Sequence, residues 1–474
     1  MMETTLIPAE LDTIEAAATN PAPITTTATN RKILHAAFGV ALAGVTVKLL
    51  ATAKELVVAA QFGRTDAMDA FLMAFLAPGL LVNLFSESMN QALIPTLVRV
   101  REVDGRDEAQ RLLTSALGWT CLLLASGAAM MGLLAHVFFP VIAPHFAATK
   151  LALTEHLLYG LLPVVLLAGL ASTGTAVLNT EGRFAGPALY PMAVPLGIMV
   201  AAAWGAPQWG IWTLEYGCVA GTLTQALLVI WAMERHGFRF RLDLARRGEA
   251  LREVAGQYGP VLLSGLVASG GLLVDQAMAA WLGPGSVSTL VYGNRFVSAA
   301  MNLLAGAIAT AATPYLSEMV ARRDWAACRN TVHTYVWLTA AVSVPVALAM
   351  IFGSRALIAL TLQHGAFHSA DTNAVAPVQA MYAIQLPFYV VSRVYYRYLV
   401  AIRRTTLILY CGAINLALDI VLNLICMRWM GIAGIALATS LWTVSTFVFL
   451  GYWTYRLLPP ELSSREGSDL RGYA

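Results

Sequence analysis

The sequence of 474 residues contains little charge: Lys, Arg, Asp and Glu together make up only 12% of it, whereas 58% is hydrophobic. A water-soluble chain of this length exposes much more charge, so the composition excludes that class and indicates an integral membrane protein. The net charge of +3 is also too small to indicate a nucleic-acid partner.

The sequence also lacks the short motifs of redox, metal and nucleotide sites. Its five cysteines are scattered and include no CxxC pair, so we interpret them as small core residues. No GxxxxGK[ST] phosphate loop is present, which argues against ATP hydrolysis within this chain. The predicted outer loops carry no acidic cluster such as a membrane glycosyltransferase needs, and we predict that the protein is not an enzyme.

What the sequence does contain is a series of apolar stretches long enough to cross ~30 Å of hydrocarbon. Six lie in the first half of the chain, at roughly 33–60, 67–97, 112–139, 151–178, 187–205 and 211–233. Six more lie at roughly 254–282, 286–317, 331–352, 376–400, 406–427 and 432–455. The sequence therefore predicts an all-α integral membrane protein with about twelve transmembrane helices.

Basic residues are distributed unevenly between the predicted loops. One alternate set of loops holds sixteen arginines, from Arg99 to Arg404, and the other set holds only Arg64, Lys150, Arg355 and Arg428. Because cytoplasmic loops carry an excess of Lys and Arg, this asymmetry predicts that both termini are cytoplasmic.

The two halves of the sequence resemble each other. Pro95 and Pro314 each lie at a predicted helix exit before a basic loop, and His145 and His364 each lie in an outer loop near a phenylalanine. Both pairs are 219 residues apart, which predicts two six-helix pseudo-repeats. Repeats of this kind are typical of transporters, whose substrate site lies in a central cavity between the halves.

These features predict five segments. Residues 1–30 lack the basic start and apolar run of a signal peptide, so we expect a disordered cytoplasmic tail. A six-helix half at 31–233 and a basic cytoplasmic linker at 234–253 follow. The second six-helix half spans 254–455, and a cytoplasmic tail spans 456–474.

Charged residues within apolar stretches must face protein or water, because a charge in lipid is costly. Lys48 and Lys54 are six residues apart, which places them ~120° apart around a helix, so both can border one wide cavity. Glu55 is positioned to neutralise one of them. The alternative for each lysine is that it extends to the membrane surface.

A second polar group lies in the predicted second and eighth helices. Asn83 and Glu87 belong to the polar run in "LLVNLFSESMNQALIP", and Asp69 opens the same helix. Arg295, well inside the eighth helix, is the candidate cation for binding an anion. The alternatives are a helix N-cap for Asp69 and an interhelical ion pair of Arg295 with Asp69 or Glu87.

A third group is rich in oxygen atoms. Asn415, Asp419 and Asn423 are four residues apart and therefore share one face of the eleventh helix. Together with Asp275 and Thr439 they offer ligands suited to a hard cation such as Na⁺, or groups for a proton relay. The alternative is hydrogen bonding between helices.

Four stretches resemble the MurJ/MviN family of the multidrug/oligosaccharidyl-lipid/polysaccharide exporter superfamily: "KLLATAKELVVAAQFGRTDAMDAFLMAFLAPGLLVNLFSESMNQALIPTL", "VYGNRF…TPYLS", "LQHGAF" and "GIAGIALATS". The resemblance implies a flippase that carries lipid II, the polyprenyl-pyrophosphate-linked precursor of peptidoglycan, across the bacterial cytoplasmic membrane by alternating access. It places the family's cavity residues at Lys48, Lys54, Asp69 and Arg295, and a sodium site at Asp275, Asn415, Asp419 and Thr439. Together with Asn83 and Glu87 from the polar run, the four cavity residues form the predicted substrate-binding set. The expected partners are the lipid-linked saccharide and membrane lipids, and the expected state is a monomer.

The sequence departs from the family pattern in several places. Lys48 and Lys54 replace arginines, and lysine binds phosphate without a bidentate fork. Val82 and Asn83 stand where an arginine pair is usual, and about twelve helices are predicted where fourteen are usual. These departures suggest a divergent relative. The alternatives are an exporter of O-antigen-type lipid-linked oligosaccharide, a cation-coupled drug exporter, and a non-transporting partner in envelope biogenesis.

Overall fold

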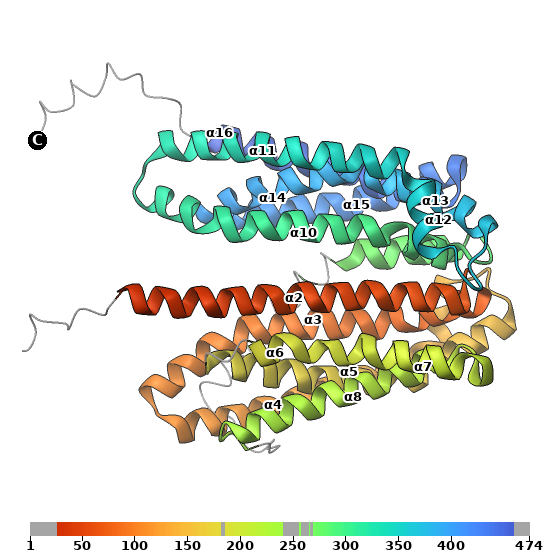
Figure 1. The fold of residues 1–474 in the computed structure, drawn as a ribbon, viewed down its shortest axis with the longest axis horizontal. Helices are drawn as coiled ribbons and strands as arrows, with labels where there is room; N and C mark the ends of the chain where they lie inside the picture. The colour runs from red at the N-terminus through yellow and green to blue at the C-terminus, as the bar shows by residue number, and fades with distance from the viewer. Residues whose placement is uncertain (1–25, 182–184, 240–255, 257–264, 266–268, 459–474) are drawn as a thin grey trace, which may run out of the picture.

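The structure of the chain, a computed structural model, describes residues 26–181, 185–239, 256, 265 and 269–458. Every regular element in these ranges is helical, and Figure 1 shows the helices in two groups, α2 to α8 and α10 to α16. Most of the predicted linker at 234–253 and most of both predicted tails lie outside the described residues. Helix α2 begins at Thr26, inside the segment predicted as a disordered tail.

The first group contains eight helical elements: α2 (Thr26–Phe62), α3 (Asp66–Val103), α4 (Arg106–Ile142), α5 (Ala148–Thr180), α6 (Ala185–Leu189), the 3₁₀ turn η1 (Tyr190–Met192), α7 (Ala193–Trp209) and α8 (Trp212–Arg235). The second group contains helical residues 269–280 and seven further helices: α10 (Ser286–Ala321), α11 (Trp325–Phe352), α12 (Ser354–Leu362), α13 (Ser369–Ala383), α14 (Gln385–Ala401), α15 (Thr405–Met430) and α16 (Ile432–Leu457).

Nine helical stretches in the described part of the chain are long and apolar enough to cross a membrane. Helices α2 and α10 lie in two of the three other predicted spans, and of the third, 254–282, the structure describes residues 256, 265 and 269–282. Large apolar side chains such as Leu133 and Phe352, 82% and 85% exposed, cover the outside of the bundle. Exposed apolar surface of this extent is typical of contact with lipid. The prediction of an all-α integral membrane protein is confirmed.

The helices run further than the apolar stretches predict, and this corrects the expected position of the prolines. Pro95 lies inside α3, which continues to Val103, and Pro314 lies inside α10, which continues to Ala321. A proline removes one backbone hydrogen bond, but neighbouring helices can compensate within a membrane bundle, so it need not end the helix.

Tight turns set the positions of the helix ends that meet at the site. Thr65 caps α3 by accepting a hydrogen bond from the Met68 amide at 3.3 Å. Gly285 precedes α10 in the left-handed conformation, with φ 73°. Glycine adopts this conformation without strain, but it has no side chain with which to cap the helix that follows.

Candidate functional site

A cavity of about 510 Å³ lies between the two groups of helices. Its walls come from α2, α3, α7 and α8 on one side and from residues 272–276, α10 and α13 on the other. Most of the lining is apolar. The charged and amide side chains that line it are Lys54, Glu55, Asn83, Asp275, Gln276, Asn294 and Arg295.

Glu55 connects the two halves across this cavity. Its side chain is 8% exposed, and its Oε1 lies 2.6 Å from Lys54 Nζ and accepts a hydrogen bond from Arg295 of α10. The interhelical ion pair expected for Arg295 therefore exists, but its partner is Glu55 rather than Asp69 or Glu87. Two cations around one carboxylate leave this group with one net positive charge in a poorly hydrated place, which favours an anion.

The other predicted substrate-binding residues are distributed differently. Lys48 is exposed and is not among the residues that line the cavity. Asn83 lines the cavity, and the side chain of Glu87 lies outside the described residues. Direct contact of Lys48, Asn83 and Glu87 with a substrate stays a prediction.

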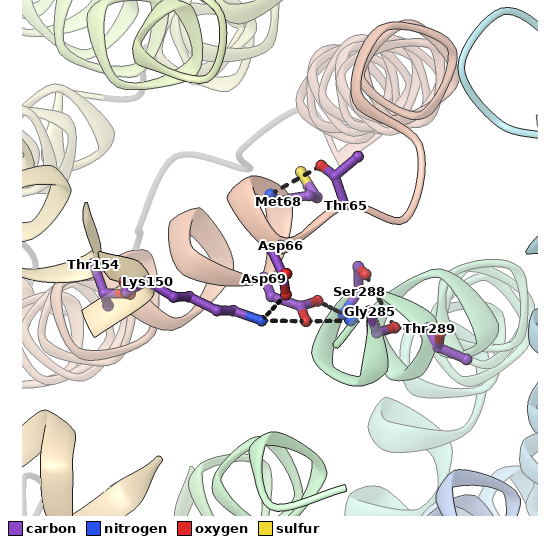
Figure 2. Close-up of polar contacts among 9 residues, drawn as sticks. All are labelled: Thr65, Asp66, Met68, Asp69, Lys150, Thr154, Gly285, Ser288 and Thr289. Atoms are coloured by element: carbon purple, nitrogen blue, oxygen red, sulfur yellow. Dashed lines mark hydrogen bonds and ion pairs between the residues drawn. The ribbon is translucent and has the colours of Figure 1, made fainter. Parts of the chain in front are cut away.

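Asp69 is completely buried and joins the halves at the end of the cavity where α3 and α10 begin (Figure 2). Its Oδ2 accepts hydrogen bonds from the Gly285 amide at 2.7 Å and from Lys150 Nζ at 3.0 Å. Its Oδ1 accepts from the Ser288 amide at 2.8 Å. Asp69 thus caps α10, the helix of the opposite half, whereas Thr65 caps Asp69's own helix. We call Asp69, Lys150, Gly285 and Ser288 the latch.

Further contacts join the halves near the latch. The Tyr292 hydroxyl donates to the Gly63 carbonyl at 3.2 Å, and the Ala366 amide donates to the Ala60 carbonyl at 2.7 Å. Arg64 lies 4.0 Å from the Asp371 carboxylate. Together with the latch, these contacts join the two halves at this end of the cavity.

The predicted cation site forms a buried cluster within the second half. Asp275 accepts hydrogen bonds from Asn423 Nδ2 at 2.7 Å and from the Thr439 hydroxyl at 2.9 Å. The same Asn423 amide donates to Asp419 at 3.1 Å. Asn415 lies a turn away and donates to Thr446. The structure therefore brings Asp275, Asp419, Asn423 and Thr439 together, and Asn415 stands beside them.

The donor set of this cluster fits a sodium ion. Within the described residues, Asp419 Oδ2, Asn423 Oδ1 and Asn415 Oδ1 are buried without a hydrogen-bond partner. Gly271 leaves room beside Asp419, because a Cβ there would lie 3.2 Å from Oδ2. The described residues contain no group of three or more His, Cys, Asp or Glu side chains that could hold a metal ion. Carboxylate, amide and hydroxyl oxygens are the ligands of a hard cation.

Sequence reasoning missed two features. The loop pattern identifies Lys150 only as an outer-loop cation, whereas in the structure its Nζ contacts Asp69. Arg393 and Arg397 lie inside the apolar span of α13 and α14, where Arg393 donates to the Tyr389 hydroxyl at 2.5 Å and lies 4.4 Å from the centre of that ring. Two arginines four residues apart in "VVSRVYYRYLV" were a visible signal.

Comparison with known proteins identifies the family. The family model "Lipid II flippase MurJ" matches residues 58–465, most of the chain. The chain belongs to the lipid II flippase MurJ family. The resemblance noted in the sequence is thus confirmed, and the family name describes transporters rather than enzymes.

Individual relatives agree with this assignment. "Probable lipid II flippase MurJ" of Thermotoga maritima is 25% identical over 420 residues, which cover 86% of this chain and 81% of the relative. The protein of the same description from Rhizobium meliloti is 25% identical over 423 residues, with coverage of 86% and 79%.

Solved structures show the same fold. One titled "Lipid II flippase MurJ, inward closed conformation" has a TM-score of 0.77 at 21% identity and covers 88% of this chain and 87% of its own. An inward-facing multidrug resistance MATE family transporter has a TM-score of 0.73 at 13% identity, with coverage of 90% and 96%. At these identities the likeness concerns the fold alone.

Proposed function

We propose that this protein flips a polyprenyl-pyrophosphate-linked saccharide, lipid II, across the bacterial cytoplasmic membrane by alternating access. The observation that carries the proposal is the group formed by Lys54, Glu55 and Arg295, which lines the cavity and joins the two halves. Family membership supplies the substrate class. The drug-exporter alternative fits less well, because a cationic drug would favour carboxylates over this net positive group.

In this mechanism the pyrophosphate of the substrate replaces Glu55 as the partner of Lys54 and Arg295. Glu55 partly neutralises the two cations while the cavity is empty, which lowers the cost of holding them in a poorly hydrated space. A cavity of about 510 Å³ is the size of a small-molecule site, so it accommodates the pyrophosphate and adjoining sugar. The polyprenyl chain remains in the bilayer.

The latch closes the end of the cavity that the distribution of loop charges predicts to be outer. We infer that the conformation described accepts substrate from the cytoplasmic leaflet and that both termini are cytoplasmic. Separation of the latch would then open the cavity to the outer leaflet.

A sodium ion at Asp275, Asp419, Asn423 and Thr439 would supply positive charge for two buried carboxylates that otherwise repel each other. Because Asp275 also lines the cavity, its charge affects the field in which the substrate is bound. The Asn423 amide and the Thr439 hydroxyl hold the Asp275 carboxylate in position by donating hydrogen bonds to it.

Complementation tests the proposal directly. The native lipid II flippase is depleted in a bacterium, and this protein is supplied intact, as Arg295→Ala, or as the control Arg322→Ala, which removes an exposed arginine at the end of the same helix. We expect growth with the intact protein and the control, and none with Arg295→Ala expressed at the same level. Failure of the well-expressed intact protein would refute lipid II as its substrate in that host.

A further inference from the structure

Lys150 is a buried lysine held by two carboxylates. It lies in the first turn of α5, is 8% exposed, and its Nζ donates to Asp66 at 2.5 Å and to Asp69 at 3.0 Å. Its Nζ also lies 4.0 Å from the centre of the Phe146 ring. A lysine is rarely buried to this extent unless charged partners offset the free energy lost when its ammonium group leaves water.

The contacts of Asp69 divide between the two halves of the protein. Lys150 belongs to the same half as Asp69, whereas Gly285 and Ser288 belong to the opposite half (Figure 2). If the halves separate at this end, Asp69 loses both amide donors and keeps only Lys150. Without Lys150, opening of the latch would leave the Asp69 carboxylate with none of its present partners.

We propose that Lys150 is the positioning residue of the latch: it holds Asp69 in place on α3 and remains as its counter-charge when the latch opens and the two amide donors withdraw. The inference rests on the proposed alternating access. It assigns Lys150 an effect on the equilibrium between closed and open latch rather than on substrate binding.

The surroundings of Lys150 suit this role. A second cavity of about 410 Å³ lies beside the latch and is lined from both halves, by Asp66, His145, Thr149, Lys150, Gly283 and Pro284 among others. Water in this cavity can reach the Lys150–Asp66 pair, whose carboxylate side chain is 58% exposed. The pair can therefore stay hydrated and charged while α10 moves away.

The proposal predicts opposite effects for the two partners. Asp69→Asn removes the charged acceptor that caps α10, so the latch should open more readily. Lys150→Met makes the carboxylate depend on α10 alone, so the latch should open less readily. If Lys150 only stabilised the packing of α5 against α3, the latch should open more readily in both variants.

The experiment measures opening as chemical access to Ser288, which is completely buried in the closed latch. Ser288→Cys is introduced into the full chain in membranes, with the five native cysteines replaced, and its rate of modification by a membrane-impermeant maleimide is measured from the outer side. Lys150→Met should lower this rate by about tenfold or more, the effect expected for one hydrogen bond to a charged group. Asp69→Asn should raise it.

Two further variants distinguish positioning from support of the fold. Lys150→Arg, which keeps the charge, should retain a rate near that of the parent. Lys150→Met combined with Asp69→Asn should give the rate of Asp69→Asn alone, because without the carboxylate the lysine has no charge at Asp69 to balance. A higher or unchanged rate in Lys150→Met would overturn the proposal. This measurement needs no substrate. Its result can therefore be interpreted even if the complementation test refutes the flippase function.

Discussion

Replacing Glu55 by Gln is the sharpest test of charge balance in the cavity. Glu55 is only 6% exposed and is the shared partner of Lys54 and Arg295, so its loss leaves two cations facing each other. Removal of one partner from a buried ion pair costs about 3–5 kcal/mol. The Arg295 side chain is 39% exposed, so water offsets part of this, and we expect the empty protein to lose about 2 kcal/mol of stability.

The same substitution should strengthen anion binding. It raises the net charge of this group from one positive charge to two. At ~4 Å and an effective dielectric constant of ~20, one more unit of charge contributes about 4 kcal/mol to binding an anion. Screening by salt and water reduces this, and an affinity for pyrophosphate at least about tenfold higher is the expected result. Transport should slow, because an anion held more tightly leaves more slowly.

Thermal unfolding of the purified protein, with and without inorganic pyrophosphate, measures both effects. Without pyrophosphate, Glu55→Gln should unfold at a lower temperature than the parent. Added pyrophosphate should raise the unfolding temperature of Glu55→Gln by more than it raises that of the parent. Glu318→Gln is the matched control, because Glu318 is an exposed carboxylate paired with Arg322 on α10. Unchanged stability together with unchanged or weaker anion affinity would refute the charge-balance argument.

Two other predictions follow from local geometry. Asp419→Asn should abolish any stabilisation of the folded protein by NaCl relative to KCl at equal ionic strength. Gly271→Ala should weaken this stabilisation, because its Cβ would lie 3.2 Å from Asp419 Oδ2. Equal stabilisation by sodium in the parent and in Asp419→Asn would contradict a cation site there. Gly285→Ala should lower the free energy of unfolding by about 1 kcal/mol or more, because its φ is 73° and a Cβ would lie 2.7 Å from the Arg64 side chain. Chemical denaturation measures this free energy of unfolding. An unchanged denaturation midpoint in Gly285→Ala would contradict the expected backbone strain.

The positions of the helices could be predicted because lipid imposes a strong pattern on sequence. A span must be apolar over the thickness of the membrane, and each predicted span other than 254–282, which is described only in part, corresponds to a described helix. The helix ends were less predictable: α3 continues beyond Pro95 to Val103 because the end of a helix depends on its caps and neighbours rather than on hydrophobicity.

The candidate site could be predicted only where its members share a helix face or carry an unusual charge. The four-residue spacing of Asp419 and Asn423 placed them together, and Arg295 attracted attention because it is a cation in an apolar span. Its true partner, Glu55, is 240 residues away, and Lys150 meets Asp69 across 81 residues. A single sequence contains no information that selects such pairs among the available carboxylates.

Two carboxylates of the first half bind α10 of the second half. Asp69 binds the amide of Ser288, and Glu55 binds the guanidinium of Arg295, seven residues or two turns further along the same helix. A pyrophosphate can compete with Glu55 for Arg295, but it cannot reach Asp69, which is completely buried beside Lys150. Under the proposed function, substrate would therefore release the attachment of α10 at Glu55 and leave those at Asp69 and at Tyr292, whose hydroxyl donates to the Gly63 carbonyl. Opening would then depend on how readily Asp69 gives up its two amide donors, and that cost is lower when Lys150 remains bound to it.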